Sequence, residues 1–310
     1  AKRSEAKPLI GIYAESGCGK TWSSLMLARG FVGPSGKIVM LETEGGRGEV
    51  FADVLPGGYD VCSMRSEFSP QNYGEAITTI EKTSPAALII DSASHEWEGS
   101  GGVLAMAAQN EAAGKKSMMI WQGPKLEHQR YFVLRLLATP IPLVIVCMRA
   151  KYPMKEVRVD GKKEWARAEQ VEPVQSDGIL YELMIHGWID REHRFRGTKY
   201  TRDDLKQVIR DGELISIKTG QELAAWARGE SQPAAPGRTD PFPGYRIPDD
   251  RAKIIADIKD LLEKVKASPD DRETWKKTYL GSADADPRTA DIAALTDYVT
   301  FLRVRSSTRA

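Results

Sequence analysis

The chain contains 310 residues, and its 44 Lys and Arg residues nearly balance 43 Asp and Glu residues, for a formal net charge of +1 at pH 7. This balance excludes binding to nucleic acid through overall charge, so such a contact needs a local basic patch. The three cysteines, Cys18, Cys62 and Cys147, lie far apart, which excludes a disulfide framework or a zinc cluster. No apolar run is long enough to cross a membrane and no signal peptide precedes the first strand, so we expect a cytoplasmic protein without membrane contact.

A short apolar strand at residues 9–13 runs into a loop of small residues that ends in Gly-Lys-Thr. Glycines at 17 and 19 let backbone N–H groups approach an anion, and the helix that starts near Lys20 directs its positive end at the same anion. Lys20 supplies a charge for the outer phosphates, and the Thr21 hydroxyl can ligate Mg²⁺. The pattern predicts a nucleotide-binding loop made of Ala14, Glu15, Ser16, Gly17, Cys18, Gly19, Lys20, Thr21 and Trp22.

One position departs from the usual phosphate-loop signature, because Ala14 stands where a glycine is expected. Alanine mainly restricts φ at the first turn of the loop. The alternative interpretation is an ordinary strand–turn–helix connection with a surface lysine. The strand before the loop and the helix after it favour phosphate binding.

Beyond the loop, strands and helices are predicted to alternate. Buried strands are expected at 37–41, 59–64, 87–92 and 143–148, and helices at 69–83, 96–113 and 124–137, the first with Ser69 as its cap and Pro70 as its first residue. This alternation predicts an α/β fold whose central sheet is doubly wound, mainly parallel and flanked by helices. Ligands of such sheets bind at the carboxyl ends of the strands, so Thr21, Glu44, Asp91 and Arg149 are expected to meet in one crevice.

Asp91 ends an apolar strand and is, with Thr21, a candidate ligand of Mg²⁺. Since Mg²⁺ keeps much of its hydration shell, we expect the contact to run through a water molecule. The alternative is an aspartate that caps the following helix, and the two roles are compatible.

Two glutamates compete for the position of the group that orients the attacking water. Hydrolysis of a terminal phosphate needs a carboxylate in line with the bond that breaks. Glu42 stands at the end of its strand, whereas Glu44 lies one step into the loop and closer to the outer phosphate. We therefore favour Glu44, with a solvated acidic loop as the alternative.

Arg149 and Lys151 follow the strand at 143–148. A cation at this strand end can sense or stabilise the charge that develops during phosphoryl transfer, in this subunit or in a neighbouring one. Lys20, Glu44 and Arg149 are thus the predicted catalytic residues. Lys151 fits a surface position in a hairpin equally well.

Three segments together resemble the core of the RecA/RadA-type P-loop ATPases, namely residues 14–21, 41–45 and 88–91. In that family an acidic-small-Glu sequence after a strand carries the catalytic glutamate, which corresponds to Glu44. The middle of the chain is similar to a narrower group, the phage-encoded RecA-like nucleotide-binding proteins found beside single-strand annealing proteins. The similar segments are Trp-Gln-Gly-Pro at 121–124 with His128, the strand end at 144–151, and Glu-Pro-Val-Gln-Ser-Asp-Gly at 172–178 with Tyr181 and Glu182.

The resemblance spans roughly residues 8–228 and implies a RecA-like P-loop core that uses ATP and Mg²⁺. It also implies a homo-oligomer, as a ring or a filament, and single-stranded DNA as a partner. One further departure is Ser176, which stands where the phage group tends to have an arginine. A contact from that position to a neighbouring subunit's nucleotide is therefore in question.

Residues 151–170 are charged and turn-rich, with Asp160-Gly161 as a predicted hairpin turn. Basic side chains beside an aromatic ring are typical of sites for single-stranded nucleic acid. The candidates for contacts with DNA or a neighbouring subunit are Lys151, Lys155, Arg158, Lys162, Lys163, Trp165 and Arg167. Acidic residues interrupt this positive charge, so a solvated hairpin is the alternative.

The remaining part of the predicted core, which spans residues 1–228, has expected strands at 179–190, 193–198 and 214–218 and helices at 202–210 and 220–228. A Pro- and Gly-rich linker is predicted at 229–248. Two apolar stripes then predict a small helical module at 249–310 that oligomerises or docks a partner, such as an annealing or single-strand-binding protein. The four histidines lack metal-ligand spacing, although His95 follows Asp91 closely enough to approach the site.

Taken together, these features predict an ATP-binding, Mg²⁺-dependent ATP hydrolase that couples its cycle to single-stranded DNA in phage recombination or replication, in the host cytoplasm. Two alternatives share the same loop. One is a nucleotide-gated adaptor that does not hydrolyse ATP, and the other is a P-loop small-molecule kinase, for which no acceptor-binding constellation is visible. The choice between ATP and GTP and the oligomeric state stay open at this point.

Overall fold

The computed structural model of the chain describes residues 6–53, 55–159, 162–168, 171–230 and 251–280, together with residues 295, 298, 299, 301, 302 and 305. All but the first two residues of the predicted linker at 229–248, and the predicted turn at 160–161, lie outside the described residues. Within the described part of the chain, no helix is both long enough and apolar enough to cross a membrane.

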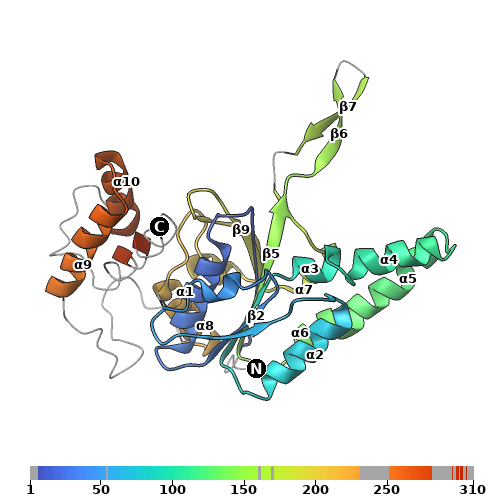
Figure 1. Cartoon of the computed structure of the whole chain (residues 1–310), viewed down its shortest axis with the longest axis horizontal. Helices are drawn as coiled ribbons and strands as arrows, with labels where there is room; N and C mark the ends of the chain where they lie inside the picture. Colours follow the sequence, from blue (N-terminus) through green and yellow to red (C-terminus); the bar gives the residue numbers. More distant parts are fainter. Residues whose placement is uncertain are drawn as a thin grey trace.

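A mainly parallel sheet forms the centre of the molecule (Figure 1). Its strands run in the order β10-β9-β1-β5-β4-β2-β3, and only β10 and the short β8, which pairs with the end of β5, are antiparallel to their neighbours. The prediction of an α/β fold with a mainly parallel sheet is therefore confirmed. The strands are β1 (Leu9–Ala14), β2 (Ile38–Glu42), β3 (Asp60–Ser63), β4 (Ala87–Asp91), β5 (Leu143–Lys151), β8 (Glu172–Pro173), β9 (Ile185–Ile189) and β10 (Phe195–Tyr200).

Helices cover both faces of this sheet. One face carries α1 and α8, and the other carries α2 with the segment η2–α6. The helical segments are α1 (Lys20–Val32), η1 (Arg47–Glu49), α2 (Pro70–Glu81), α3 (Ser94–Glu98), α4 (Val103–Ala112), α5 (Met118–Glu127), the π-helical η2 (His128–Val133), α6 (Leu134–Ala138), α7 (Asp177–Glu182), the 3₁₀ segment η3 (Asp203–Gln207) and α8 (Ile217–Ala227).

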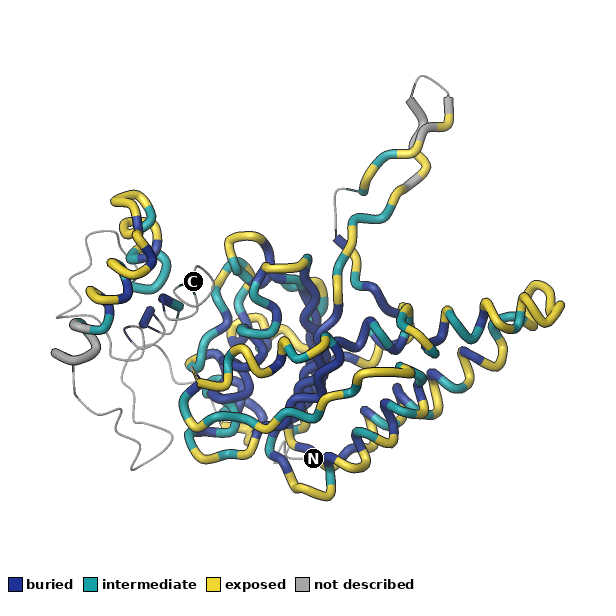
Figure 2. Tube along the Cα trace, in the orientation of Figure 1, coloured by how far each residue is buried: buried dark blue, intermediate teal, exposed yellow. Residues whose placement is uncertain are grey.

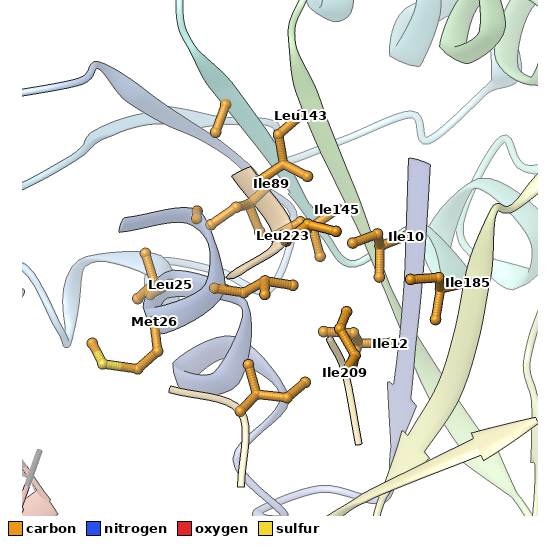
Figure 3. Packing of buried hydrophobic residues seen from close by; sticks show 14 of the residues in the cluster. Ile10, Ile12, Leu25, Met26, Ile89, Leu143, Ile145, Ile185, Ile209 and Leu223 are labelled. Carbon is orange, nitrogen blue, oxygen red and sulfur yellow. The ribbon is translucent and has the colours of Figure 1, made fainter. Parts of the chain in front are cut away.

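Alternate residues of each buried strand face opposite cores, as the period of a strand requires. In β1, Ile10 and Ile12 pack towards α1 and α8, whereas Leu9 and Tyr13 belong to the cluster on the other face. Figure 2 shows the strands as the buried centre of the molecule, and Figure 3 shows the first cluster from close by. Because both faces are covered, the strands are continuously apolar, and this pattern made them recognisable in the sequence.

The helices α1 and α8 approach each other most closely through glycine. A Cβ atom added to Gly30 would lie 1.9 Å from the carbonyl oxygen of Ile217, and one added to Gly220 would lie 2.2 Å from that of Leu27. No larger residue fits this crossing without moving one helix. The contact holds the helix that follows the phosphate-binding loop against the sheet.

Several predicted boundaries were right. Ser69 caps α2, since its side-chain oxygen accepts a hydrogen bond from the Asn72 backbone N–H at 3.2 Å, and Pro70 is the first helical residue. The helix predicted at 220–228 corresponds to α8 and begins slightly earlier, at a capping box between Ser216 and Thr219.

Other boundaries were wrong, each for a local reason. The predicted helix at 96–113 is two helices, α3 and α4, because the chain turns at Gly101 with φ +74°. The predicted helix at 124–137 starts at Met118 and contains Pro124, and a π-helical stretch follows it. The first residues of the predicted strand at 179–190 form α7 instead, and the predicted strand at 214–218 is replaced by a single bridge between Arg194 and Leu214 and the start of α8.

Two elements project from the core in Figure 1. One is the antiparallel hairpin of β6 (Met154–Val159) and β7 (Lys162–Arg167), which follows β5 directly, and the other is the helix pair α4–α5. Residues beyond the core include α9 (Arg251–Lys264) and α10 (Pro269–Leu280). Their apolar side chains pack with residues near the C-terminus, and the resulting cluster contains Ile258, Leu261, Val265, Ala267, Trp275, Leu295, Tyr298, Val299 and Leu302. We call the described residues from 251 onwards the C-terminal module.

His186 on β9 provides a test of the buried sheet. Burial and the nearby Lys199 ammonium lower the pKa of His186 to about 4. The pKa of a histidine in an unfolded chain is about 6.5. The contribution of neutral His186 to the stability of the fold is therefore complete above that pH and is lost as the pH falls towards the lower pKa of the folded chain. We expect His186→Phe to show a smaller drop in urea midpoint between pH 7 and pH 4.5 than the parent chain. An equal drop in both chains would contradict this role of His186.

Candidate functional site

The loop between β1 and α1 turns on two left-handed glycines, Gly17 with φ +84° and Gly19 with φ +88°. Residues other than glycine rarely adopt this backbone conformation. His193, from the turn between β9 and β10, packs on the loop, with its Nδ1 2.8 Å from the carbonyl oxygen of Cys18. A Cβ atom on Gly19 would also lie 3.0 Å from this nitrogen. His193 therefore braces the loop, a role that its position in the sequence did not reveal.

Lys20, Thr21 and Asp91 meet at the start of α1. The Thr21 hydroxyl donates a hydrogen bond to Asp91 Oδ2 at 2.5 Å, and Lys20 Nζ lies 3.7 Å from Asp91 Oδ1. Lys20 and Asp91 are only 9% and 4% exposed. Burial disfavours the charged form of Lys20, but the Asp91 carboxylate and other acidic neighbours outweigh this effect and raise its pKa. The ammonium is therefore kept charged in a partly desolvated position.

The same residues fit a magnesium ion. Asp91 Oδ1 is buried and accepts no hydrogen bond from the described residues, so one carboxylate oxygen beside the Thr21 hydroxyl is available to a cation or its water shell. Magnesium is usually held by one or two protein oxygens together with substrate phosphates. The described residues contain no cluster of three or more His, Cys, Asp and Glu side chains that could hold a metal alone.

The structure separates the two competing glutamates. Glu42 is 1% exposed, and its Oε1 accepts hydrogen bonds from the backbone N–H groups of Glu44 at 2.6 Å and Gly46 at 3.1 Å. Its carboxylate thus shapes the loop after β2. Both glutamates line the cavity above the loop between β1 and α1. They differ in their partners: among the described residues, backbone N–H groups occupy the Glu42 carboxylate, whereas arginine side chains pair with the Glu44 carboxylate.

Arg149 holds Glu44 in place from the end of β5. Its Nε lies 3.3 Å from Glu44 Oε1, and its Nη1 lies 3.8 Å from Glu98 Oε1 on α3. Arg47 lies 3.8 Å from the second Glu44 oxygen. Two arginines therefore neutralise Glu44, and a nucleotide that attracts either of them alters the electrostatic environment of this carboxylate.

The parallel register explains why these residues meet. Glu42 pairs with Asp91 and Asp91 pairs with Cys147, so the carboxyl ends of β2 and β4 are level, while Ala14 at the end of β1 pairs with Arg149, two residues further along β5. Above this edge lies a cavity of about 720 Å³. The predicted residues that line it are Ala14, Glu15, Ser16, Gly17, Gly19, Lys20, Thr21, Trp22, Glu44, Asp91 and Arg149, and Cys18 alone of the predicted loop does not.

A polar network links the Asp91 strand end to its surroundings. The Thr43 hydroxyl lies 2.7 Å from His95 Nδ1 and accepts a hydrogen bond from the Ser92 backbone N–H at 2.9 Å. Burial and the Arg149 charge lower the pKa of His95, so its ring is neutral at neutral pH. His95 thus contacts Thr43, the residue before Glu44.

A second network, which the sequence did not reveal, fixes α3. Glu96 is fully buried, and its two carboxylate oxygens lie 2.9 Å from His128 Nδ1 and 3.1 Å from Gln175 Nε2. His128 Nε2 lies 2.8 Å from the Ser176 hydroxyl. Ser176 therefore belongs to an internal network that joins α3, η2 and the turn before α7.

The predicted basic residues of the hairpin have different environments. Trp165 is 69% exposed, and Lys163 is exposed and pairs with Glu156 at 2.9 Å. Arg167 points back to the core, where it lies 3.7 Å from Glu15 and 3.9 Å from the Tyr152 ring centroid. Lys151 is exposed and does not line the cavity. The side chains of Lys155, Arg158 and Lys162 lie outside the described residues.

Comparison with known proteins adds little to this description. No protein-family profile matches the sequence, and no curated protein matches it. A solved structure that is similar to the chain is that of a prototypical ATPase from the type III secretion system of pathogenic bacteria. The two share 14% sequence identity, with 96% of this chain and 81% of that chain covered, at a TM-score of 0.37. A likeness this distant carries no argument about activity.

Proposed function

We propose that the chain is a P-loop ATPase of the RecA/RadA type that binds ATP with Mg²⁺ and hydrolyses the terminal phosphoanhydride. The observation that carries this proposal is the meeting of Lys20, Thr21 and Asp91 below a cavity that Glu44 also lines. The buried Lys20 ammonium and the glycine-containing loop suit the phosphates, and the Glu44 carboxylate suits the attacking water.

In the proposed mechanism, backbone N–H groups of residues 16–21 and the Lys20 ammonium bind the phosphate oxygens. Thr21 and Asp91 would hold Mg²⁺, which supplies charge neutralisation for the phosphates when bound. Glu44 accepts a hydrogen bond from a water aligned with the terminal phosphorus. As the new P–O bond forms and the bond to the ADP oxygen breaks, the water proton passes to Glu44 or to the released phosphate, and Arg149 stabilises the developing charge.

We further propose that the cycle acts on single-stranded DNA through the β6–β7 hairpin, in phage recombination or replication in the host cytoplasm. Strand β5 ends at Lys151, two residues after Arg149, and the hairpin begins at Met154. Arg167 at the base of the hairpin contacts Glu15 of the loop between β1 and α1. A nucleotide that displaces Glu15 would therefore alter this base contact. A homo-oligomer, ring or filament, and an annealing or single-strand-binding partner belong to the same proposal.

The DNA part is tested with the exposed ring at Trp165. Since stacking on one aromatic side chain contributes about 1–3 kcal/mol per base, Trp165→Ala should weaken binding of an oligothymidylate about 5- to 100-fold and reduce its stimulation of phosphate release. Fluorescence anisotropy and a phosphate-release assay measure the two effects.

Met154→Ala is the matched control, because Met154 is 56% exposed on the same hairpin but has no ring. Equal DNA affinity for the parent and Trp165→Ala would rule out stacking at this position. If the chain hydrolyses ATP and DNA does not stimulate the reaction, the DNA proposal fails and the ATPase proposal stands. Phosphate that appears on a small acceptor would instead favour the kinase alternative.

A further inference from the structure

Two kinds of side chain line the cavity above the loop between β1 and α1. One set is polar or charged and includes Lys20, Thr21, Glu44 and Asp91. The other set, which we call the apolar half of the lining, includes Trp22, Met26, Val50, Phe51, Leu214 and Ile215. A nucleoside triphosphate has the same division, with an anionic chain at one end and a flat apolar base at the other, so the apolar half suits the base.

One wall of the apolar half comes from the core. The rings of Trp22 and Phe51 lie 5.7 Å apart at 46°, and Ile215 comes from the segment before α8. Trp22 directly follows Thr21, so the ring lies just beyond the phosphate-binding residues along the chain. A base bound here would continue from phosphates that Lys20 and Thr21 hold.

A further group of lining residues comes from a distant part of the chain. Tyr279 at the end of α10, Phe301 and Arg305 line the same cavity as the phosphate-binding loop. The rings of Tyr279 and Phe301 lie 4.9 Å apart at 31°, and the Arg305 guanidinium lies 5.8 Å from the Phe301 centroid. The C-terminal module therefore presents aromatic surface and a cation to a site whose expected ligand is an aromatic base with negative charges attached.

From this arrangement we infer that the C-terminal module is the second wall of the nucleobase site, so that the base of a bound nucleoside triphosphate lies between Trp22 and Phe51 of the core and Tyr279 and Phe301 of the module. This inference rests on the proposed function for the phosphates and adds the subsite for the base. The module thereby takes a role in nucleotide binding, in addition to the docking role expected from its sequence. A bound nucleotide links the module to the core, which makes the position of the module dependent on nucleotide.

The test compares two ligands of the full-length chain that differ only in the nucleoside. Tyr279→Leu and Phe301→Leu keep apolar volume in the module but remove the rings. Each should weaken ATP binding about 10-fold, because an aromatic–base contact is lost, and should leave binding of inorganic tripolyphosphate unchanged. Isothermal titration calorimetry in the presence of Mg²⁺ measures both ligands.

Two control variants separate failure of this inference from failure of the proposed function. Tyr181→Leu changes a tyrosine that is 79% exposed away from the cavity and should bind both ligands like the parent. Lys20→Ala should weaken both ligands. Unchanged ATP affinity in Tyr279→Leu and Phe301→Leu would overturn the base site alone, whereas unchanged affinity in Lys20→Ala would overturn the phosphate site.

A second measurement does not depend on any variant. When the unmodified full-length chain is irradiated with 8-azido-ATP and Mg²⁺, the label should appear in peptides from residues 270–310 as well as in the core, and excess ATP should abolish it. Peptide mapping by mass spectrometry locates the label. Labelling confined to residues 6–230 would overturn the inference.

Discussion

Replacing Glu44 with glutamine is expected to lower the rate of phosphate release from ATP by about 10²- to 10⁴-fold, the range for loss of a general base. The amide keeps the shape of the side chain but cannot accept a proton from the attacking water. ATP binding should stay close to that of the parent, because we assign phosphate binding to Lys20 and the loop and not to Glu44. Single-turnover phosphate release and calorimetric ATP binding measure the two parts separately.

The matched control is Glu98→Gln, since Glu98 also pairs with Arg149 but does not line the cavity. It should keep most of the parent rate, which would show that the loss in Glu44→Gln is not caused by a displaced Arg149. Glu42→Gln tests the competing glutamate. Full activity in Glu44→Gln together with a large loss in Glu42→Gln would reverse the assignment of the two residues, and absence of release from the parent chain would favour the adaptor alternative.

Replacing Lys20 with alanine should weaken ATP binding by about 10- to 100-fold or more, since one hydrogen bond from a charged group contributes about 1.5–3 kcal/mol. The change also leaves the buried Asp91 carboxylate without its nearest cation, which disfavours its charged form and its use as a metal ligand. Phosphate release should fall along with binding. Calorimetry with ATP and Mg²⁺ and a phosphate-release assay at saturating ATP measure the two effects.

Lys163→Ala is the control for this variant, because Lys163 is an exposed lysine of the hairpin with a surface pair to Glu156. It should bind ATP like the parent. Circular dichroism and thermal unfolding of Lys20→Ala show whether the buried site still folds. A folded Lys20→Ala chain with parent affinity for ATP would exclude the predicted phosphate-binding role of the loop.

The loop between β1 and α1 and the strands around it were predictable because they depend on local patterns. The strand at 9–13, the glycines at 17 and 19 and the residues Lys20 and Thr21 form a contiguous signal. The apolar strands that end near Asp91 and Arg149 are equally local, and parallel pairing then brings their ends to one edge. Boundaries near Gly101 and Pro124 were missed, since the chain turns at Gly101 with φ +74° and α5 contains Pro124 instead of starting at it.

Roles that depend on hydrogen bonds between distant segments were not predictable. The choice between Glu42 and Glu44 as the residue that orients the water depends on which carboxylate accepts hydrogen bonds from the backbone N–H groups of Glu44 and Gly46. His193 carried no recognisable spacing, yet it lies against the loop because the turn after β9 folds over Cys18. Arg167 was grouped with the basic hairpin, but its side chain pairs with Glu15.

By itself, the sequence determined that a glycine-containing loop follows the first strand of a mainly parallel α/β sheet, because glycine positions and apolar periodicity are encoded within a few residues of each other. Only the tertiary structure decided which charged groups meet at this loop and which aromatic residues face it. Glu44 and Arg149 are 105 residues apart in the sequence, and Cys18 and His193 are 175 residues apart. A local sequence pattern cannot reveal contacts between residues so far apart along the chain. Their contacts follow from strand order and helix packing, which the whole chain sets together.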